Sequence, residues 1–177
     1  MDLPLTPRSI WTIGHSTHSL QDFITMIHSF GINVLADIRS YPGSRRFPHF
    51  NQESLKTSLQ ENGIRYLHYR DLGGRRKPLP DSTNTAWRHA AFRGYADYME
   101  TTQFQHSISD LERVAMQHKT AYMCSEAVWW RCHRALVSDY LKTRNWEVKH
   151  ITSAGSSTLH PFTSAARVEE GKLLYTG

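Results

Sequence analysis

Short apolar runs alternate along the chain with longer amphipathic segments. The runs are rich in β-branched and aromatic residues, which is typical of buried strands. Most of them stop at a glycine or at polar residues that favour turns. This pattern predicts five strands, over residues 9–14, 32–39, 64–69, 120–124 and 146–151.

The segments between these runs repeat apolar residues at helical spacing. After the first run, Leu20, Phe23 and Ile27 recur every three or four positions. Ser19 is the expected N-cap of this helix, and Gly31 is expected to end it. Further helices are expected over residues 51–62, 94–99, 104–117 and 132–144.

Strands that alternate with helices predict a doubly wound, Rossmann-like three-layer α/β domain with a mainly parallel sheet of about five strands. The 177 residues suffice for one hydrophobic core, so a single domain is expected over residues 1–177. Residues 1–8 are expected to be a short lead, and the polar tail from about residue 152 is expected on the surface. The Gly- and Pro-rich segment 73–84 is expected to be a long loop that serves as a lid or binding segment.

Reactive residues follow four of the predicted strands at the same edge of the sheet, and Arg70 and Asp71 follow the third of these strands. His15 follows the first strand, Asp37 and Arg39 end the second, and Cys124 and Glu126 follow from the fourth. Ligands of such sheets bind beyond the carboxyl ends of the strands. A turn needs only turn-forming residues, so this concentration of reactive side chains predicts a functional site at that edge.

Charge and hydropathy narrow the class of partner. The formal net charge is +5 and the pI is about 9.4, which favours anionic partners such as nucleotides, nucleic acid or phosphorylated metabolites. No apolar run is long enough to cross a bilayer, and the N-terminus lacks the pattern of a secretory signal. We therefore expect a cytoplasmic protein without a membrane partner, whose thiols stay reduced.

The two cysteines of the chain, Cys124 and Cys132, stand eight positions apart. Cys132 opens a predicted helix beside His133 and Arg134, a position that lowers the pKa of a thiol. Such a thiolate is a nucleophile or a metal ligand. Both cysteines could equally be small buried hydrophobes. A redox disulfide is disfavoured, because the CxxC spacing is missing.

A divalent metal is the one cofactor that these donors would hold. The metal ligands would be Cys124, Cys132 and His133, with His15 as the fourth across the edge of the sheet. No CxxC pair and no HxxxH pair supports this assignment.

The remaining candidates would bind substrate or move protons. His15 is expected as acid or base, and Cys124 and Glu126 as nucleophile and proton shuttle, with Asp37 orienting a neighbouring group. The hydroxyl and backbone groups of the turn after the first strand would hold an anion. The expected substrate-binding residues are Ser16, Thr17, Arg39, Arg45, Arg46, Tyr69 and Arg134. The competing interpretation is structural: Gly14 makes a turn, the serines cap the helix, and Asp37 pairs with Arg39.

Several motifs together resemble the domain-of-unknown-function family 488. They are GHST, DIRSYPGSRRFPHFN, YRDLGG, MCSE and WWRCHRALVSDYL, followed by His160 and Pro161. The resemblance runs from about residue 10 to residue 161, and its most specific part is Cys-x-Glu followed by Cys-His-Arg. It implies a compact α/β domain with a site built from these motifs, and it implies no reaction.

Three hypotheses about function remain. The first is an enzyme, of the thiol-dependent or metal-assisted transferase or hydrolase type, that acts on an anionic, nucleotide-like or nucleic-acid-like substrate. The second is a nucleic-acid-binding module in which the cysteines are structural and the basic loops bind phosphates; its arginines would be Arg45, Arg46, Arg75 and Arg76. The third is a mononuclear metal-binding protein.

Overall fold

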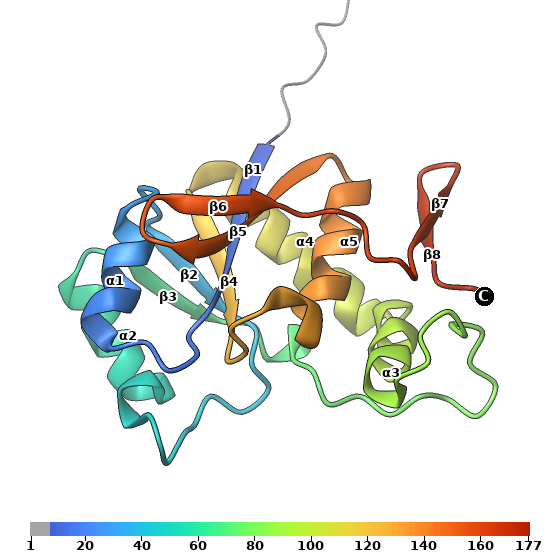
Figure 1. The fold of residues 1–177 in the computed structure, drawn as a ribbon, viewed down its shortest axis with the longest axis horizontal. Helices are drawn as coiled ribbons and strands as arrows, with labels where there is room; N and C mark the ends of the chain where they lie inside the picture. Colours follow the sequence, from blue (N-terminus) through green and yellow to red (C-terminus); the bar gives the residue numbers. More distant parts are fainter. Residues whose placement is uncertain (1–7) are drawn as a thin grey trace, which may run out of the picture.

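A six-stranded sheet forms the centre of the structure, a computed structural model that describes residues 8–177 (Figure 1). Its strands lie in the order β3-β2-β4-β1-β5-β6. The first five strands pair in parallel, and β6 is antiparallel to β5. Their bounds are β1 (Arg8–Gly14), β2 (Val34–Asp37), β3 (Arg65–His68), β4 (Thr120–Cys124), β5 (Trp146–Ser153) and β6 (Ser156–Leu159). The expected lead lies outside the described residues, except for Arg8, which begins β1.

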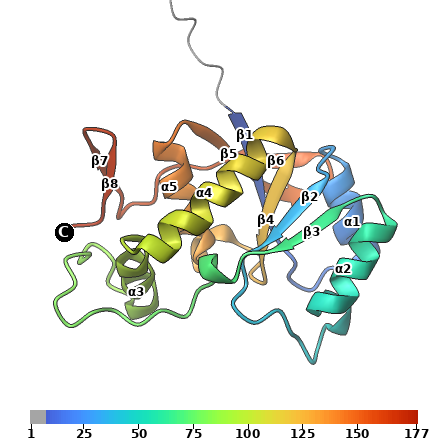
Figure 2. The same ribbon diagram turned by 180° about the vertical axis from the view of Figure 1, so that it is seen from behind.

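Helices cover both faces of the sheet, which confirms the predicted three-layer α/β fold (Figure 2). One face carries α1 (Leu20–His28) and α2 (Gln52–Glu61). The other carries α4 (Thr102–Gln117) and α5 (Arg134–Thr143), with α3 (Ala90–Met99) beside them. Between residues 8 and 177, none of the helices has the length and hydrophobicity that crossing a bilayer requires.

Alternate residues of each strand pack into different hydrophobic clusters, because successive side chains of a strand point to opposite faces. In β1, Trp11 and Ile13 belong to the cluster under α1 and α2, whereas Ile10 belongs to the cluster under α4 and α5. In β4, Cys124 faces the same side as Ile10, and Met123 faces the other. The side chain of Cys124 therefore points towards α5.

The helix ends match the sequence pattern in part. The Ser19 hydroxyl accepts a hydrogen bond from the Asp22 amide at 3.1 Å, so Ser19 is the N-cap that the sequence predicts. Helix α3 begins at Ala90, before the expected start at residue 94. Helix α5 begins at Arg134, which leaves Cys132 just ahead of it.

The tail is more structured than predicted. It contributes the edge strand β6 and a hairpin of β7 (Arg167–Glu169) and β8 (Lys172–Leu174). The expectation of a surface tail is wrong for two side chains, since His160 and Tyr175 are only 2% and 3% exposed. Both are buried because they form hydrogen bonds to the carboxylate of Asp139 inside the domain.

The loop over residues 73–84 is fastened to α3. The Asp97 carboxylate accepts hydrogen bonds from the Leu79 amide at 2.8 Å, the Ser82 hydroxyl at 2.6 Å and the Asn84 side chain at 2.7 Å. The guanidinium of Arg76 lies over the Tyr98 ring, 3.6 Å from its centroid. These contacts hold the loop against α3, and its expected role as a lid or binding segment stays a prediction.

Candidate active site

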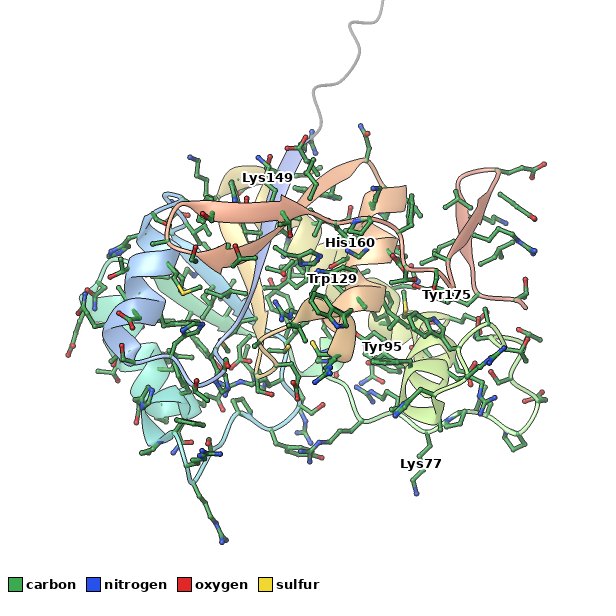
Figure 3. All side chains as sticks on the ribbon, viewed as in Figure 1. Lys77, Tyr95, Trp129, Lys149, His160 and Tyr175 are labelled. Atoms are coloured by element: carbon green, nitrogen blue, oxygen red, sulfur yellow. The ribbon has the colours of Figure 1, made fainter. Side chains whose placement is uncertain are left out.

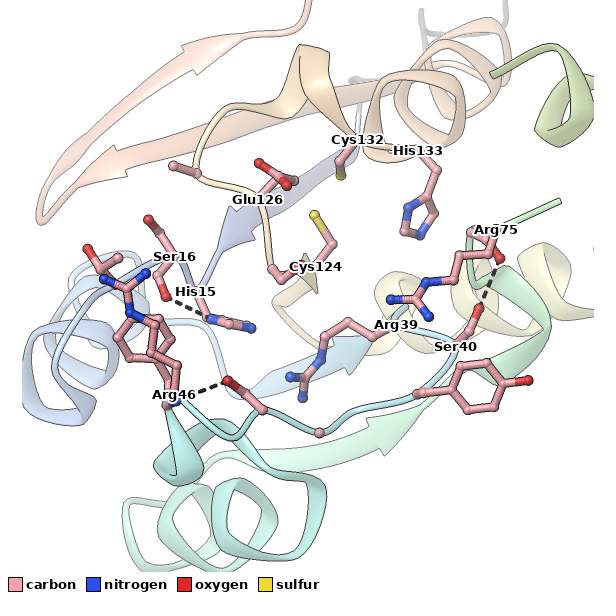
Figure 4. Close-up of a pocket in the computed structure, with 18 residues that line it drawn as sticks. His15, Ser16, Arg39, Ser40, Arg46, Arg75, Cys124, Glu126, Cys132 and His133 are labelled. Atoms are coloured by element: carbon pink, nitrogen blue, oxygen red, sulfur yellow. Dashed lines mark hydrogen bonds between the residues drawn. The ribbon is translucent and has the colours of Figure 1, made fainter. Parts of the chain in front are cut away.

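A cavity of about 630 Å³ opens at the carboxyl ends of β1, β2 and β4 (Figure 4). This is the edge of the sheet at which the sequence places the reactive residues. The cavity lies within the size range of small-molecule sites in proteins. Of the expected residues, those that line it are His15, Ser16, Thr17, Arg39, Arg46, Arg75, Cys124, Glu126, Cys132 and His133.

Gly14 allows the segment after β4 to cross the end of β1. A Cβ atom at Gly14 would lie 1.7 Å from the carbonyl oxygen of Glu126, so no other residue fits there without displacing that segment. The amides of His15 and Ser16 donate to the carbonyls of Cys124 and Ser125, both at 2.9 Å. The expectation that backbone amides of this turn hold an anion is wrong for these two, because both amides are already bonded. The Ser16 and Thr17 side chains still line the cavity.

The two cysteines meet at the base of the cavity, with their sulfur atoms turned towards each other (Figure 4). Both are free thiols and nearly fully buried. Cys132 Sγ accepts the backbone N–H of Arg134, the first residue of α5, at 3.3 Å. His133 is the N-cap, so the prediction that Cys132 opens the helix is off by two residues, although its thiol bonds to the first turn.

The thiols ionise at different pH. Burial raises the pKa of Cys124 well above its ordinary value, and the neighbouring Cys132 raises it further. Burial also opposes ionisation of Cys132, but the hydrogen bond from Cys124 and the charge and N–H groups of Arg134 lower its pKa to about 7. These directions favour ionisation of Cys132 over Cys124, and so do not favour the expected role of Cys124 as the nucleophile.

Arg134 lies behind the cysteines and does not line the cavity. It is 1% exposed, and its Nε donates to Cys124 Sγ at 3.1 Å. Its Nη2 donates to the carbonyls of Glu126 at 2.6 Å and Ala127 at 3.4 Å. The expectation that Arg134 binds the anionic substrate is therefore wrong. Its donors are used inside the protein, where they hold the thiols and the segment after β4.

Asp37 holds Arg39 at the opposite side of the cavity. The carboxylate is fully buried and accepts Arg39 Nε at 2.9 Å and Nη2 at 2.7 Å. Nη2 also donates to the Phe50 carbonyl, which leaves Nη1 without a hydrogen-bond partner among residues 8–177. Asp37 does not line the cavity, so its place fits the expected orienting role. Arg39 lines the cavity, as an anion-binding residue must.

Three other arginine and tyrosine expectations do not fit the geometry. Tyr69 is 7% exposed and donates to Asp110 at 2.9 Å, away from the cavity, because the chain turns into a 3-10 helix (Arg70–Leu72) directly after it. Arg45 is exposed but is not among the cavity residues, whereas its neighbour Arg46 is. Arg76 is packed on Tyr98 and donates to the Gly73 carbonyl, so the four arginines of the nucleic-acid hypothesis are not equally available.

A metal site gains no support from the arrangement of side chains. Within the part of the chain that the structure describes, no three His, Cys, Asp or Glu side chains are grouped so that they could hold a metal ion. His133 Nε2 donates to the Ile38 carbonyl at 2.8 Å. One ring nitrogen of the expected ligand His133 is therefore already in use.

His15 is neutral at physiological pH. Its ring is 4% exposed, stacks on Phe50 at 4.4 Å and donates from Nδ1 to the Ser16 carbonyl at 3.0 Å. Burial, with a smaller effect of Arg39, lowers its pKa to about 4. At neutral pH the ring can accept a proton, but it carries no imidazolium proton to release. Of its two expected roles, that of a base therefore remains and that of an acid does not.

The buried His15 makes stability depend on pH. The unfolded chain binds a proton at His15 near pH 6.5, whereas the folded chain does so only near pH 4. The unfolded state therefore binds more protons in this interval, and stability falls as the pH drops from 6.5 to 4. His15→Asn keeps a donor near Nδ1 and should reduce the slope of unfolding free energy against pH by up to about 1.4 kcal/mol per pH unit. Urea unfolding at several pH values checks this, and equal slopes would mean that His15 titrates normally in the fold.

Sequence reasoning missed a buried polar cluster behind Arg134. It comprises Thr12 on β1, His150 on β5, Asp139 on α5 and His160 after β6, all of which are at most 2% exposed. The available signal is that Thr12 and His150 are polar residues inside predicted buried strands. A polar side chain in such a position requires a partner.

The comparisons with known proteins concern the segment that holds the cysteines. A family model described as "Domain of unknown function DUF488" matches residues 19–141. No curated protein and no solved structure matches the chain. The match includes Cys124, Glu126, Cys132 and Arg134, but it leaves out the turn at His15 that the motif resemblance includes. Since it spans well over half of the sequence, the chain belongs to the DUF488 family, as its cysteine motif indicates.

Proposed function

We propose that this protein is a thiol-dependent enzyme of the cytoplasm that acts on an anionic small molecule, with Cys132 as the nucleophile. The observation that carries the proposal is the meeting of a thiol pair with arginines in one cavity. Cys124 and Cys132 lie at its base, and Arg39, Arg46 and Arg75 line it. A thiolate near neutral pH is nucleophilic, and arginine is the side chain best suited to phosphate and carboxylate groups.

The substrate class follows from size and surroundings. A cavity of about 630 Å³ suits a nucleotide or a metabolite of similar size. Tyr41 and Phe47 line it beside the arginines and offer ring faces for a base. A nucleotide or comparable phosphate-bearing metabolite is therefore the substrate class that we propose.

The reaction class is nucleophilic substitution with a covalent intermediate. The Cys132 thiolate attacks an electrophilic atom next to the anionic group, a bond forms to sulfur, and the leaving group departs with its electron pair. Glu126 has an exposed side chain at the cavity and passes a proton to the leaving group. Water or another acceptor then attacks the same atom and gives its proton to Glu126, while the bond to sulfur breaks and its electron pair restores the thiolate. Cys124 donates its hydrogen bond to the thiolate, and neutral His15 accepts hydrogen bonds from bound groups.

Alkylation of the native protein with iodoacetamide tests the thiol. We expect Cys132 to react with a midpoint near its pKa of about 7, and Cys124 to remain unmodified there. Mass spectrometry of peptides assigns each cysteine, and Cys124→Ser is the matched control that keeps a hydroxyl donor beside Cys132. A nucleoside monophosphate should slow the alkylation of Cys132, because it occupies the arginine-lined cavity.

Two results would count against the proposal. If neither cysteine reacts below pH 8.5 in the folded protein, both are structural and the enzyme hypothesis fails. If a single-stranded oligonucleotide protects Cys132 and mononucleotides do not, the nucleic-acid-binding alternative takes its place. Protection by the oligonucleotide should then weaken steeply as salt rises.

A further inference from the structure

A continuous chain of hydrogen bonds runs from the thiol pair through the buried interior to Asp139. Arg134 Nη1 donates to Thr12 Oγ1 at 3.1 Å, and Thr12 Oγ1 lies 2.6 Å from His150 Nδ1. His150 Nε2 lies 2.8 Å from His160 Nδ1, and His160 Nε2 lies 2.8 Å from Asp139 Oδ1. Each of the five residues in this hydrogen-bond chain is at most 2% exposed.

The fold brings these residues together from four elements. Thr12 and His150 are register partners on the neighbouring strands β1 and β5, and both face α5. Asp139 lies on α5. His160 follows β6 (Figure 3). The Asp139 carboxylate is held from the other side by the Tyr175 hydroxyl at 2.7 Å and the Thr163 hydroxyl at 2.6 Å.

The two ends of the chain dictate its direction. A guanidinium only donates and an ionised carboxylate only accepts. With one proton on each ring, His160 donates from Nε2 to Asp139, and its bare Nδ1 accepts from His150 Nε2. The bare Nδ1 of His150 then accepts from the Thr12 hydroxyl, whose oxygen accepts from Arg134. Each donor thus has one acceptor, and no link can be reversed alone.

The surroundings of His150, in the middle of the hydrogen-bond chain, keep its ring uncharged. The Trp129 ring stacks on His150 at 4.7 Å with an interplanar angle of 5°. It also meets His160 edge-on at 4.8 Å, and Figure 3 shows the two residues close together. Burial, reinforced by His160 and Arg134, lowers the pKa of His150 to about 2. His150 is therefore a neutral link at any ordinary pH.

We propose that Thr12, His150, His160 and Asp139 act as positioning residues, which fix the guanidinium of Arg134 against Cys124 through this one-directional chain. The guanidinium holds Cys124 through Nε and the carbonyls of Glu126 and Ala127 through Nη2, and the hydrogen-bond chain holds its third nitrogen, Nη1. Cys132 receives the backbone N–H of the same residue. The influence of these hydrogen bonds on catalysis rests on the proposed function, whereas the hydrogen bonds themselves do not.

The charged and titratable groups that face the thiol pair come from several elements. They are Arg134 and His133 at the start of α5, Tyr95 on α3, Tyr122 on β4 and, around the cavity, His15 after β1, Arg39 after β2, Glu126 after β4 and the loop residues Arg46 and Arg75. A variant that probes the chain must leave all of them unchanged. Thr12 meets this condition, because its hydroxyl touches Arg134 and His150 but not the cavity.

Thr12→Val and Thr12→Ser form a matched pair. Valine keeps the shape and removes the hydroxyl, whereas serine keeps the hydroxyl. For Thr12→Val we expect the alkylation midpoint of Cys132 to rise by about one pH unit, which makes the reaction at pH 6 about tenfold slower. For Thr12→Ser we expect the wild-type profile. If the wild type has an activated thiol and the alkylation profile of Cys132 is unchanged in Thr12→Val, the hydrogen-bond chain is not coupled to the thiols. The proposed function would then remain intact.

A second measurement needs no variant and no reactive thiol. Long-range ¹H–¹⁵N correlation spectra of the histidine rings should show a proton on Nε2 and a bare Nδ1 in both His150 and His160. A proton on Nδ1 of either ring would overturn the proposed direction of the chain. If the wild type shows the expected tautomers but no activated thiol, the proposed function is wrong, and so is the coupling of the hydrogen-bond chain to the thiols. The hydrogen-bond chain itself would still be supported.

Discussion

Arg134→Gln is expected to abolish the activated thiol and to lower the free energy of unfolding by about 3–5 kcal/mol, the usual cost of breaking a buried charged network. The guanidinium makes four side-chain hydrogen bonds, to Cys124, Thr12, Glu126 and Ala127. Glutamine cannot reach all of these acceptors, and it carries no charge to favour a thiolate. The alkylation midpoint of Cys132 should therefore rise above the ordinary thiol range. Urea unfolding and alkylation against pH measure the two effects.

Arg134→Lys separates the charge of Arg134 from its shape. An ammonium keeps the positive charge but cannot span three directions as a planar guanidinium does. We expect a stability loss close to that of Arg134→Gln, with a Cys132 midpoint between wild type and Arg134→Gln. A lysine variant with wild-type stability would show that the fork of hydrogen bonds contributes little, and that charge alone matters.

The parallel sheet could be predicted because its signal is local. Buried parallel strands are apolar on both faces, so runs such as residues 120–124 stand out, and their match with β4 extends to both ends. Strand β6 has no such signal, because all four of its residues are exposed and it sits at an edge of the sheet. Strands β7 and β8 are only three residues long.

The cavity could be predicted from a topological rule, whereas the direction of single side chains could not. Parallel strands place their carboxyl ends at one edge, which is sufficient to bring His15, Arg39 and Cys124 together. Whether Arg134 faces the cavity or the interior depends on where α5 begins, and a shift of two residues turns a helical side chain by about 200°. In the structure the guanidinium faces inward, where it bonds to Cys124 and Thr12.

The buried chain behind Arg134 could not be predicted, because its partners are far apart in sequence. Thr12 and Arg134 are separated by 122 positions, and Thr12 and His150 by 138. Only the order β4-β1-β5 places them side by side. A polar residue in a buried strand indicates that a partner exists, but it does not say which one.

Asp37→Asn is expected to destabilise the fold by about 3–5 kcal/mol, because it leaves the Arg39 guanidinium without its charged partner. The two side chains are 0% and 8% exposed, so water cannot replace the lost carboxylate. Tyr66→Phe is the matched control. It removes only the 2.6 Å hydrogen bond from the Tyr66 hydroxyl to Asp37, and should cost about 1–2 kcal/mol. Urea unfolding of the three proteins at pH 7 makes the comparison, and equal losses would mean that the ion pair adds nothing to its hydrogen bonds.

The same variant tests whether Arg39 binds an anion. Arg39 lines the cavity and keeps Nη1 for a ligand, while Asp37 already balances its charge. At a given concentration, inorganic phosphate stabilises a protein more when it binds the folded state more tightly. In Asp37→Asn the guanidinium lacks a counter-charge, so phosphate should raise the melting temperature more than it does in wild type or Tyr66→Phe. Equal shifts in all three proteins would place the anion elsewhere and leave Arg39 with a structural role alone.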